Sequence, residues 1–436
     1  MALTGRAALV ALAGVVPLVL APGAPTLLAW LLLLAALVAV DLALAGSARA
    51  IRVVRDPVPT VRLGEPVQVG LVLGNAGRRR VRGLLRDGWS PSAGDTTRRH
   101  RIDVPAGQQR RLVTTLLPTR RGDRRTERVT IRSVGPLGVA ARQASLPAPG
   151  AVRVLPAFPS RRHLPGKLAR LRELDGLVSA AVRGRGTEFD SLRDYVDGDD
   201  VRSIDWRATA RRHAGRAGVS PVVRTWRPER DRQLLLVLDT SRTAAARVGD
   251  APRLDAAMDA ALLLAALASR AGDRVDLLAM DRRVRARVEG VGRSSLLPAL
   301  VGAMAPLEAD LVEADWAAVA AAVLRRLSRR ALVVLLSTVD SAAVADELLP
   351  VLPLLTLRHQ VLLASVTDPA VDSLAEGRGD AYAVYGAAAA ARAVLERTAV
   401  TAELQRLGVE VVEGTPELLP PRLADRYLAL KAAGRL

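Results

Sequence analysis

Cysteine is absent from this chain of 436 residues, and aromatic residues make up only 3% of it. The absence of cysteine excludes disulfide bonds, thiolate metal sites and cysteine nucleophiles together. Because phenylalanine, tyrosine and tryptophan are scarce, the hydrophobic cores must be built from leucine, valine and alanine. The chain is longer than one ordinary domain and has room for two or three. The sequence therefore predicts a multi-domain protein with aliphatic cores.

The sequence also lacks the short motifs that accompany common enzyme chemistry. It contains no G-x-x-x-x-G-K-[ST] phosphate-binding loop, no H-E-x-x-H metal motif and no G-x-S-x-G nucleophile elbow. The four histidines, His100, His163, His213 and His359, stand far apart in the sequence. We therefore predict that the protein is not an enzyme.

Negative charge is in short supply, and the formal net charge is +19. Such an excess suggests nucleic acid or an anionic membrane surface as a partner. The positive residues are mostly arginines in short runs along the whole chain, and no RNP-type aromatic pair or Cys/His finger accompanies them. A composition bias toward arginine gives the same count. We expect no specific nucleic-acid partner, and binding of nucleic acid or anionic surfaces through the arginine excess stays open as an alternative.

Two long hydrophobic runs lie at the N-terminus. Residues Ala7 to Ala21 and Thr26 to Val40 are apolar and are separated by the turn from Pro22 to Pro25. Each run is a little shorter than the roughly 20 residues that a helix needs to cross a bilayer. The segment from Asp41 to Ala45 can extend the second run into the interface. We predict that residues 1–48 form two transmembrane helices.

The charges that flank these runs predict their orientation. Arg6 precedes the first run and Arg49, Arg52 and Arg55 follow the second, whereas the turn carries no charge. The positive-inside rule then places both ends, and the soluble domains after them, in the cytoplasm. The alternative is a cleaved signal peptide with Arg6 in its basic region. Two apolar runs with a Pro-Gly break are too long for the hydrophobic region of one signal peptide.

The middle of the chain reads as β-structure. Val67, Val69, Leu71 and Leu73 alternate with mostly small or polar residues, and glycine and proline punctuate several similar segments. We predict a β-sandwich-like domain over residues 49–158. Residues 159–232 are predicted to form a connector that begins with a short helix.

Residues 233–436 alternate between strand-like and helix-like segments, as a doubly wound α/β domain requires. The expected strands are Gln233 to Leu238, Arg274 to Met280, Val284 to Val288 at an edge, Ala331 to Leu336, Gln360 to Val366 and Gly408 to Val412. The expected helices are Arg253 to Arg270, Asp315 to Arg329, Ser341 to Leu355, Ala383 to Leu407 and Leu419 to Leu430.

The first of these strands ends in an acid and two alternating hydroxyls, Asp239, Ser241 and Thr243. In an open α/β sheet, ligands bind at the carboxyl ends of the strands. Oxygen ligands suit Mg²⁺, which keeps several waters in its octahedral shell. The pattern D-x-S-x-T resembles the metal-ion-dependent adhesion site of von Willebrand factor A domains. The resemblance implies Mg²⁺ or another divalent cation on these residues, with Asp340 as an acid from a later loop.

One ligand of that site is missing from the sequence. Ala314 stands in E-A-D-W, where the resemblance implies a threonine. The neighbouring acids Glu313 and Asp315 are candidates to compensate through a water. Because Mg²⁺ demands strict geometry, a degenerate site that binds no metal is the alternative.

A longer motif precedes the first strand, R-x-Y-x-x-G-D-D-x-R-x-I-D-W-x-A-x-A-R. Its signature residues are Arg193, Tyr195, Gly198, Asp199, Asp200, Arg202, Asp205, Trp206 and Arg211. This motif resembles the signature of the DUF58 family. Members are bacterial membrane proteins with a von Willebrand factor A-like domain, often encoded beside MoxR-type AAA+ ATPases. The resemblance implies a protein of the bacterial cell membrane with a MoxR-type ATPase as its protein partner. Our hypothesis is a non-catalytic adaptor whose A-like domain presents Asp239, Ser241 and Thr243 to that partner.

The acids of the motif allow a second interpretation. Asp239 together with Asp197, Asp199, Asp200 and Asp205 would suit a divalent-metal-dependent hydrolase if the carboxylates converged on metal ions. The arginines between these acids favour ion pairs instead. We therefore expect an arginine and aspartate belt that braces the β domain against the α/β domain.

Overall fold

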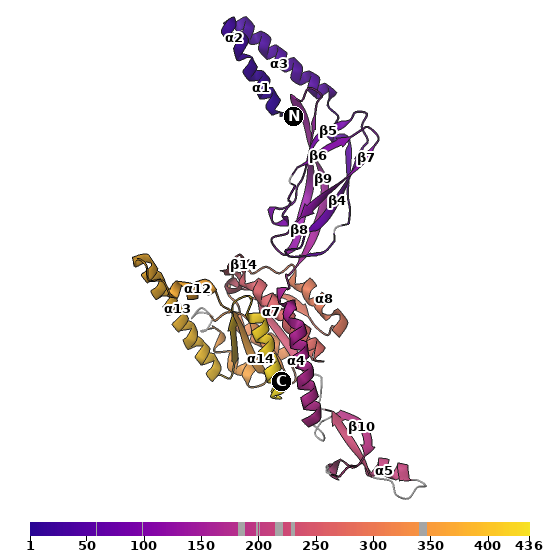
Figure 1. Ribbon diagram of the computed structural model, residues 1–436, viewed down its shortest axis with the longest axis vertical. Helices are drawn as coiled ribbons and strands as arrows, with labels where there is room; N and C mark the ends of the chain where they lie inside the picture. The colour runs from indigo at the N-terminus through magenta and orange to yellow at the C-terminus, as the bar shows by residue number, and fades with distance from the viewer. Residues whose placement is uncertain are drawn as a thin grey trace. The chain divides into compact units, whose positions relative to one another are not determined.

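The structure is a computed structural model and describes residues 1–57, 59–97, 99–181, 188–197, 199, 201–213, 221–227, 232–339 and 347–436. The chain divides into two compact units, Met1–Ala157 and Phe158–Leu436 (Figure 1). The first holds apolar helices and a β-sandwich, and the second holds a mixed six-stranded sheet covered by helices. The expectation of a multi-domain chain with an apolar N-terminal helix and mixed sheets is confirmed.

The N-terminal helices fold back on one another. The helices are α1 (Gly5–Ala13), α2 (Val15–Leu20) and α3 (Ala24–Leu44). The indole Nε1 of Trp30 donates to the carbonyl of Val10 at 3.2 Å. A Cβ on Gly14 would lie 2.2 Å from the same indole, so only glycine fits at this close approach. Among the residues that the structure describes, one helix, which begins at Ala24, is long and apolar enough to cross a membrane, whereas the apolar segment Gly5–Leu20 is shorter.

Two sheets form the β-sandwich of the first unit. One has the order β2-β4-β7, with β2 (Ile51–Arg55), β4 (Val67–Asn75) and β7 (Gln109–Leu116). The other has the order β1-β9-β8-β5-β6, with β3 also paired to β9. Its strands are β1 (Ala2–Leu3), β3 (Val61–Arg62), β5 (Val81–Asp87), β6 (His100–Val104), β8 (Gly122–Val134) and β9 (Ala140–Leu155). Alternating aliphatic residues such as Leu71, Leu73 and Ile131 fill the space between the sheets.

Asp41 ties α3 to the sandwich. This carboxylate lies near the end of the helix, is fully buried, and accepts hydrogen bonds from the backbone N–H groups of Leu137, Val139 and Ala140 at 2.8, 2.6 and 2.7 Å. A Cβ on Gly135 would lie 2.2 Å from Asp41, so the loop can approach the carboxylate only with glycine there. Asp41 therefore joins the end of α3 to the loop between β8 and β9.

The second unit begins with a helix and a small hairpin-like sheet. Helix α4 (Leu164–Ala181) follows the short helical turn η3 (Pro159–His163). Strands β10 (Glu188–Asp194) and β11 (Val222–Arg227) pair antiparallel, and α5 (Trp206–His213) lies between them in sequence.

The main sheet of the second unit has the order β16-β15-β12-β17-β18-β19. The strands are β12 (Gln233–Asp239), β15 (Arg274–Met280), β16 (Val284–Val288), β17 (Leu332–Leu336), β18 (Gln360–Val366) and β19 (Glu410–Gly414). All neighbours pair parallel except β16, which is an antiparallel edge strand. The apolar central strands are buried on both faces, as parallel strands between two layers of helices must be.

Helices cover both faces of this sheet. The elements between the strands are α6 (Arg242–Ala245), the short pair β13 (Arg247–Val248) and β14 (Ala251–Pro252), α7 (Arg253–Arg270), α8 (Arg293–Met304), α9 (Trp316–Arg326), α11 (Leu352–Thr356), α12 (Pro369–Ala375), α13 (Ala381–Arg406) and α14 (Leu419–Ala432). One aliphatic core joins Val237 and Val333 of the sheet to Val323 of α9 and Leu404 of α13. On the other side α7 contacts both the sheet and α14.

The expected strands agree with the structure to within two residues at their ends. Helix α9 ends at Arg326, three residues before the expected end, and the helix expected from Ser341 to Leu355 is interrupted by a turn at residues 349–351. Helices α8 and α12 were not among the expected helices. The last strand was expected from Gly408 to Val412 and lies two residues later at both ends. The first apolar run is divided at Gly14 into α1 and α2. The first part of the helix expected from Ser341 lies outside the described residues.

A buried carboxylate of helix α7 joins this helix to the start of the second unit. Asp259 of α7 accepts a hydrogen bond from Ser160 Oγ at 2.7 Å and another from the Ser160 N–H at 3.3 Å. Burial raises the pKa of Asp259 to about 6, although the hydrogen bonds from Ser160 and the charge of Arg162 act in the opposite direction. The ionised carboxylate is therefore less stable in the folded protein than in the unfolded chain.

Replacing Asp41 tests the joint between the helix and the sandwich. Asp41→Ala leaves the backbone N–H groups of Val139 and Ala140 buried without an acceptor, which costs roughly 1–3 kcal/mol for each. We expect a lower melting temperature of the detergent-solubilised chain and faster proteolysis within residues 135–140. The matched control is Asp56→Ala, because Asp56 forms an exposed ion pair with Arg111 that contributes little. Equal losses in the two variants would contradict the role of Asp41.

The raised pKa of Asp259 predicts how stability depends on pH. A carboxyl group whose folded pKa lies above its unfolded pKa contributes stability below about pH 4 and loses it as the pH rises through about 6. Asp259→Asn removes this dependence while keeping an oxygen that accepts from Ser160. We expect the variant to gain up to about 3 kcal/mol at pH 8 and nothing at pH 4. Thermal unfolding at both pH values checks this, with the exposed Asp250→Asn as control.

Candidate functional site

The candidate site lies where the order of the main sheet reverses. From β12 the chain continues to β15 and β16 on one side, and it later returns to β17, β18 and β19 on the other side. Leu238 of β12 is paired with Leu336 of β17, so Asp239 and Ser337 follow two adjacent strand ends. Ligands of doubly wound sheets bind at such a switch point, outside the carboxyl ends of the strands.

Hydroxyl groups from both loops surround the carboxylate of Asp239. Its Oδ2 accepts hydrogen bonds from Ser337 Oγ at 2.5 Å and from Thr243 Oγ1 at 3.1 Å. Its Oδ1 accepts from the Ser241 N–H at 2.8 Å, and the hydroxyls of Ser241 and Thr243 lie 3.1 Å apart. The structure thus brings together Asp239, Ser241 and Thr243, as the sequence pattern predicts, and adds Ser337.

A small cavity opens beside this cluster. Its volume is about 10 Å³, room for about one water molecule or ion. Asp239, Thr243 and Ser337 contribute to its lining, together with Arg253 at the start of α7. The Arg253 guanidinium donates to Thr338 Oγ1 at 3.1 Å. The cavity therefore combines one carboxylate with one permanent positive charge.

A second layer of contacts holds the loop after β12. Thr240 Oγ1 donates to Asp281 Oδ2 at 3.0 Å, and the Thr240 carbonyl accepts from the Asp310 N–H at 2.9 Å. Arg285 bridges Asp281 and Asp310. These contacts come from three different loops at the same sheet edge, so the orientation of Asp239 depends on all of them.

The donor set fits a divalent cation only in part. Asp239, Ser241, Thr243 and Ser337 supply oxygen atoms, which Mg²⁺ prefers, but they carry a single negative charge. Ala314 is buried, and its side chain carries no oxygen. A cation here would need waters or a carboxylate from a partner, and Arg253 would repel it.

The two neighbouring acids are already engaged. Glu313 pairs with Arg242, and Asp315 accepts from the Ala318 N–H at the start of α9. Asp340, predicted as a further metal ligand, lies outside the described residues. Among the residues that the structure describes, no three His, Cys, Asp or Glu side chains gather where they could hold a metal ion.

The signature segment forms a polar unit of its own. Arg193 of β10 pairs with Asp199. Asp205 accepts from the backbone N–H groups of Arg207 and Ala208, both at 3.0 Å, and pairs with Arg224 of β11 at 2.7 Å. The hydrogen bond from Ala208 and the bond from Arg224 lower the pKa of Asp205. Asp205 thereby caps α5 and links it to β11.

The remaining signature residues have different environments. Tyr195 is half-buried, and its N–H donates to the Pro221 carbonyl at 2.7 Å. Arg202 and Arg211 are exposed, and Trp206 is 65% exposed at the start of α5. Gly198 and Asp200 lie outside the described residues.

Among the described residues, the signature acids Asp199 and Asp205 do not form a metal centre with Asp239. Asp199 and Asp205 are held by arginines of their own segment. The ion pairs described here connect β10, α5 and β11 to one another. Among the described residues these ion pairs brace the segment internally, and the belt between the β domain and the α/β domain stays a prediction.

Comparison with known families selects the same region. Residues 191–401 match DUF58, described as a protein of unknown function. The matched range includes the signature residues from Arg193 to Arg211, together with Asp239 and Ser337. It names a family without assigning an activity.

Two mycobacterial proteins are relatives of this chain, and their names assign no activity. The chain is 30% identical over 206 residues to Uncharacterized protein Rv1480 of Mycobacterium tuberculosis and to Uncharacterized protein Mb1516 of Mycobacterium bovis. The alignment covers 45% of this chain and 62% of each relative. Less than two thirds of the length of these relatives is therefore matched.

Solved structures show only distant likenesses. A CARDB domain from Pyrococcus furiosus is 16% identical, covers 24% of this chain and 91% of that chain, and has a TM-score of 0.19. PapD-like domain 7 of human CEP192 is 16% identical, covers 25% of this chain and 87% of that chain, and has a TM-score of 0.18. Scores this low support no conclusion about function.

Sequence reasoning missed two residues of the site. Ser337 is the first residue after β17, and its position at a strand end next to the switch point was the signal for it. Arg253 gave no such signal, because it begins a helix and reaches the site only through the fold.

The positive charge of Arg253 leads to a prediction about metal affinity. Arg253→Gln removes a charge that repels a cation beside Asp239 and keeps a donor for Thr338. We expect Mg²⁺ to bind about tenfold more tightly to this variant than to the unmodified chain. The Mg²⁺-dependent rise in melting temperature measures this. The control is the exposed Arg247→Gln on β13. An unchanged or weaker Mg²⁺ response in Arg253→Gln would contradict the prediction.

Proposed function

We propose that this protein is a membrane-anchored, non-catalytic adaptor whose second unit binds a protein partner at the Asp239 edge of its sheet. The observation that carries the proposal is the convergence of hydroxyls from two loops on the Asp239 carboxylate at the switch point. Such a polar, prearranged edge suits recognition of a charged group on another molecule.

A von Willebrand factor A-like identity is proposed for the sheet domain. Its support is the strand order, with parallel strands and one antiparallel edge strand β16, together with the D-x-S-x-T loop after the first strand. In this interpretation Asp239, Ser241, Thr243 and Ser337 would hold a divalent cation. The cation would supply the positive charge that a partner's carboxylate binds. Asp340 is retained as a further proposed ligand.

A two-pass anchor is proposed for the N-terminus. The Trp30–Val10 hydrogen bond and the close approach at Gly14 support a paired helical hairpin in preference to a single span. Arg6 lies in the first turn of α1, and Arg49, Arg52 and Arg55 follow α3, which supports cytoplasmic soluble units at a bacterial cell membrane.

A MoxR-type AAA+ ATPase is proposed as the partner, from the family resemblance. The signature segment offers a second contact surface for it. Trp206, Val196 and Val201 are 65%, 61% and 62% exposed on this segment. Exposed apolar residues within a polar, ion-paired frame are typical of protein interaction sites. The Asp239 edge and the signature surface are therefore the two regions on which binding should depend.

The hydrolase alternative receives less support from the geometry. Asp199 and Asp205 are neutralised by Arg193 and Arg224. Two-metal hydrolysis requires free carboxylates around a pair of ions.

Affinity capture from membranes of a native host tests the adaptor proposal. The tagged full-length chain is compared with Asp239→Asn, which preserves the size of this buried side chain and removes its charge. We expect an AAA+ ATPase to be recovered with the unmodified chain in Mg²⁺ and about tenfold less with Asp239→Asn or with EDTA.

Two further variants sharpen the capture experiment. Asp250→Asn makes the same chemical change at an exposed position and should leave recovery unchanged. Trp206→Ser should reduce recovery, whereas Leu357→Ser, also at an exposed apolar residue, should not. Full recovery with Asp239→Asn and with Trp206→Ser would contradict the proposal.

A further inference from the structure

The β-sandwich of the first unit contains an open cavity that the adaptor proposal does not use. Its volume is about 390 Å³, within the range of small-molecule sites. Residues around the end of β5 and along β8 line it, among them Arg86, Arg125 and Arg128. Ser90, Thr126 and Thr130 add hydroxyl groups to the same lining.

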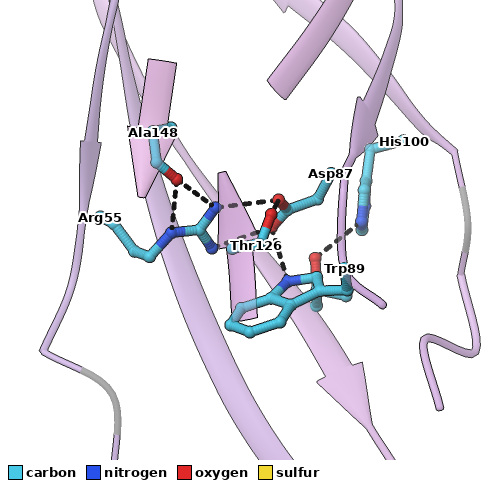
Figure 2. Close-up of polar contacts among 7 residues, drawn as sticks. Arg55, Asp87, Trp89, His100, Thr126 and Ala148 are labelled. Atoms are coloured by element: carbon cyan, nitrogen blue, oxygen red, sulfur yellow. Dashed lines mark hydrogen bonds and ion pairs between the residues drawn. The ribbon is translucent and has the colours of Figure 1, made fainter. Parts of the chain in front are cut away.

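A buried ion pair stiffens the wall of this cavity. Figure 2 shows the Arg55 guanidinium donating to both carboxylate oxygens of Asp87, each at 2.9 Å, and to the Ala148 carbonyl. Trp89 donates to Asp87 at 2.8 Å and lies under the Arg55 guanidinium, 4.9 Å from ring centroid to charge. Thr126 donates to Asp87 at 3.3 Å. Asp87 thus connects β5, β2 and β8, and its partner Thr126 is one of the lining residues.

The backbone keeps the lining segments close together. The N–H of Gly88 donates to the Arg128 carbonyl at 3.1 Å, and a Cβ on Gly88 would lie 2.6 Å from that oxygen. The pairing of β8 with β9 shifts register between Thr126 and Arg128. This irregularity interrupts the strict alternation of β8, so that Arg125 and Arg128 both contribute to the cavity.

The charge of the lining is largely uncompensated. Within the described part of the chain, Arg86 and Arg125 form no ion pair. Arg128 has a loose contact of 3.9 Å with Glu127, whose side chain is 83% exposed. Such an exposed pair contributes little and leaves the guanidinium able to exchange partners. Three arginines and one glutamate therefore leave the cavity with an excess of positive charge.

The side chains that line the cavity indicate which class of ligand it can bind. The planar fork of an arginine matches the oxygens of a phosphate group. The described lining residues include no aromatic side chain, so a nucleobase finds no surface for stacking on them. A phosphate group on a polar, non-aromatic carrier suits these residues best.

We propose that the cavity between β5 and β8 is a binding site for a phosphate-bearing ligand, held by Arg86, Arg125 and Arg128. The phosphate can belong to a soluble molecule or to a lipid headgroup. This site lies in the first unit and is independent of the Asp239 edge.

Calorimetric titration of the full-length chain in neutral detergent with inorganic pyrophosphate tests the proposal. We expect saturable binding of one pyrophosphate, weakened about tenfold or more by each of Arg86→Gln, Arg125→Gln and Arg128→Gln. The matched controls are Arg82→Gln and Arg101→Gln, at exposed arginines of β5 and β6 outside the cavity lining. The controls should bind like the unmodified chain.

Two outcomes would overturn the site. Absence of saturable pyrophosphate binding to the unmodified chain would exclude it. Equal weakening in the control variants would assign the binding to the general arginine excess. Melting temperatures without ligand check that every variant is folded, which is expected because the replaced side chains are exposed.

Competition then separates the two sources of phosphate, and either result supports the site. A water-soluble, short-chain phosphatidylglycerol is added below its micelle concentration to the pyrophosphate complex. Displacement of pyrophosphate by this lipid assigns the site to a headgroup, and retention of pyrophosphate assigns it to a soluble phosphate compound.

Discussion

The pairing of β12 on both of its edges is the constraint on which the candidate site depends. β12 lies parallel to β15 on one side and to β17 on the other. Because of this position, β12 and β17 end side by side, at Asp239 and directly before Ser337. The two side chains therefore meet directly at the strand ends, and no long loop is needed to bring them together. If the register of β17 changed by one residue, Ser337 would turn to the other face and its bond to Asp239 would be lost.

Buried carboxylates connect segments that are distant in the sequence at several places in this arginine-rich chain. Asp41 holds a loop of the sandwich against α3, and Asp87 connects three strands through Arg55, Trp89 and Thr126. Asp259 joins α7 to the segment before α4. An ionised carboxylate accepts several short hydrogen bonds at once, which explains why single acids serve at points where distant segments meet. The arginine excess then remains on the surface, where the cavity of the sandwich concentrates part of it.

The elements were more predictable than their ends or their contacts. The strands β12, β15, β16 and β18 are close to their expected bounds, because continuous aliphatic runs bounded by charged residues have few other ways to be buried. The shift of β19 and the break at Gly14 arise from packing that local patterns do not report. In the candidate site, the D-x-S-x-T spacing correctly predicted that Asp239, Ser241 and Thr243 lie together at the end of β12. Ser337 and Arg253 come from elsewhere in the sequence and were missed for that reason.

By itself, the sequence determined the two kinds of unit, the apolar N-terminal hairpin, the alternation of strands and helices, and the cluster of oxygens after the first strand. These features follow from local periodicity and from neighbours within a few residues. Only the tertiary structure decided which loops meet at Asp239, which acids of the signature are neutralised, and that Arg86, Arg125 and Arg128 share one cavity. Those relations depend on strand order and register, and strand order is set by long-range packing that no local segment of the chain encodes.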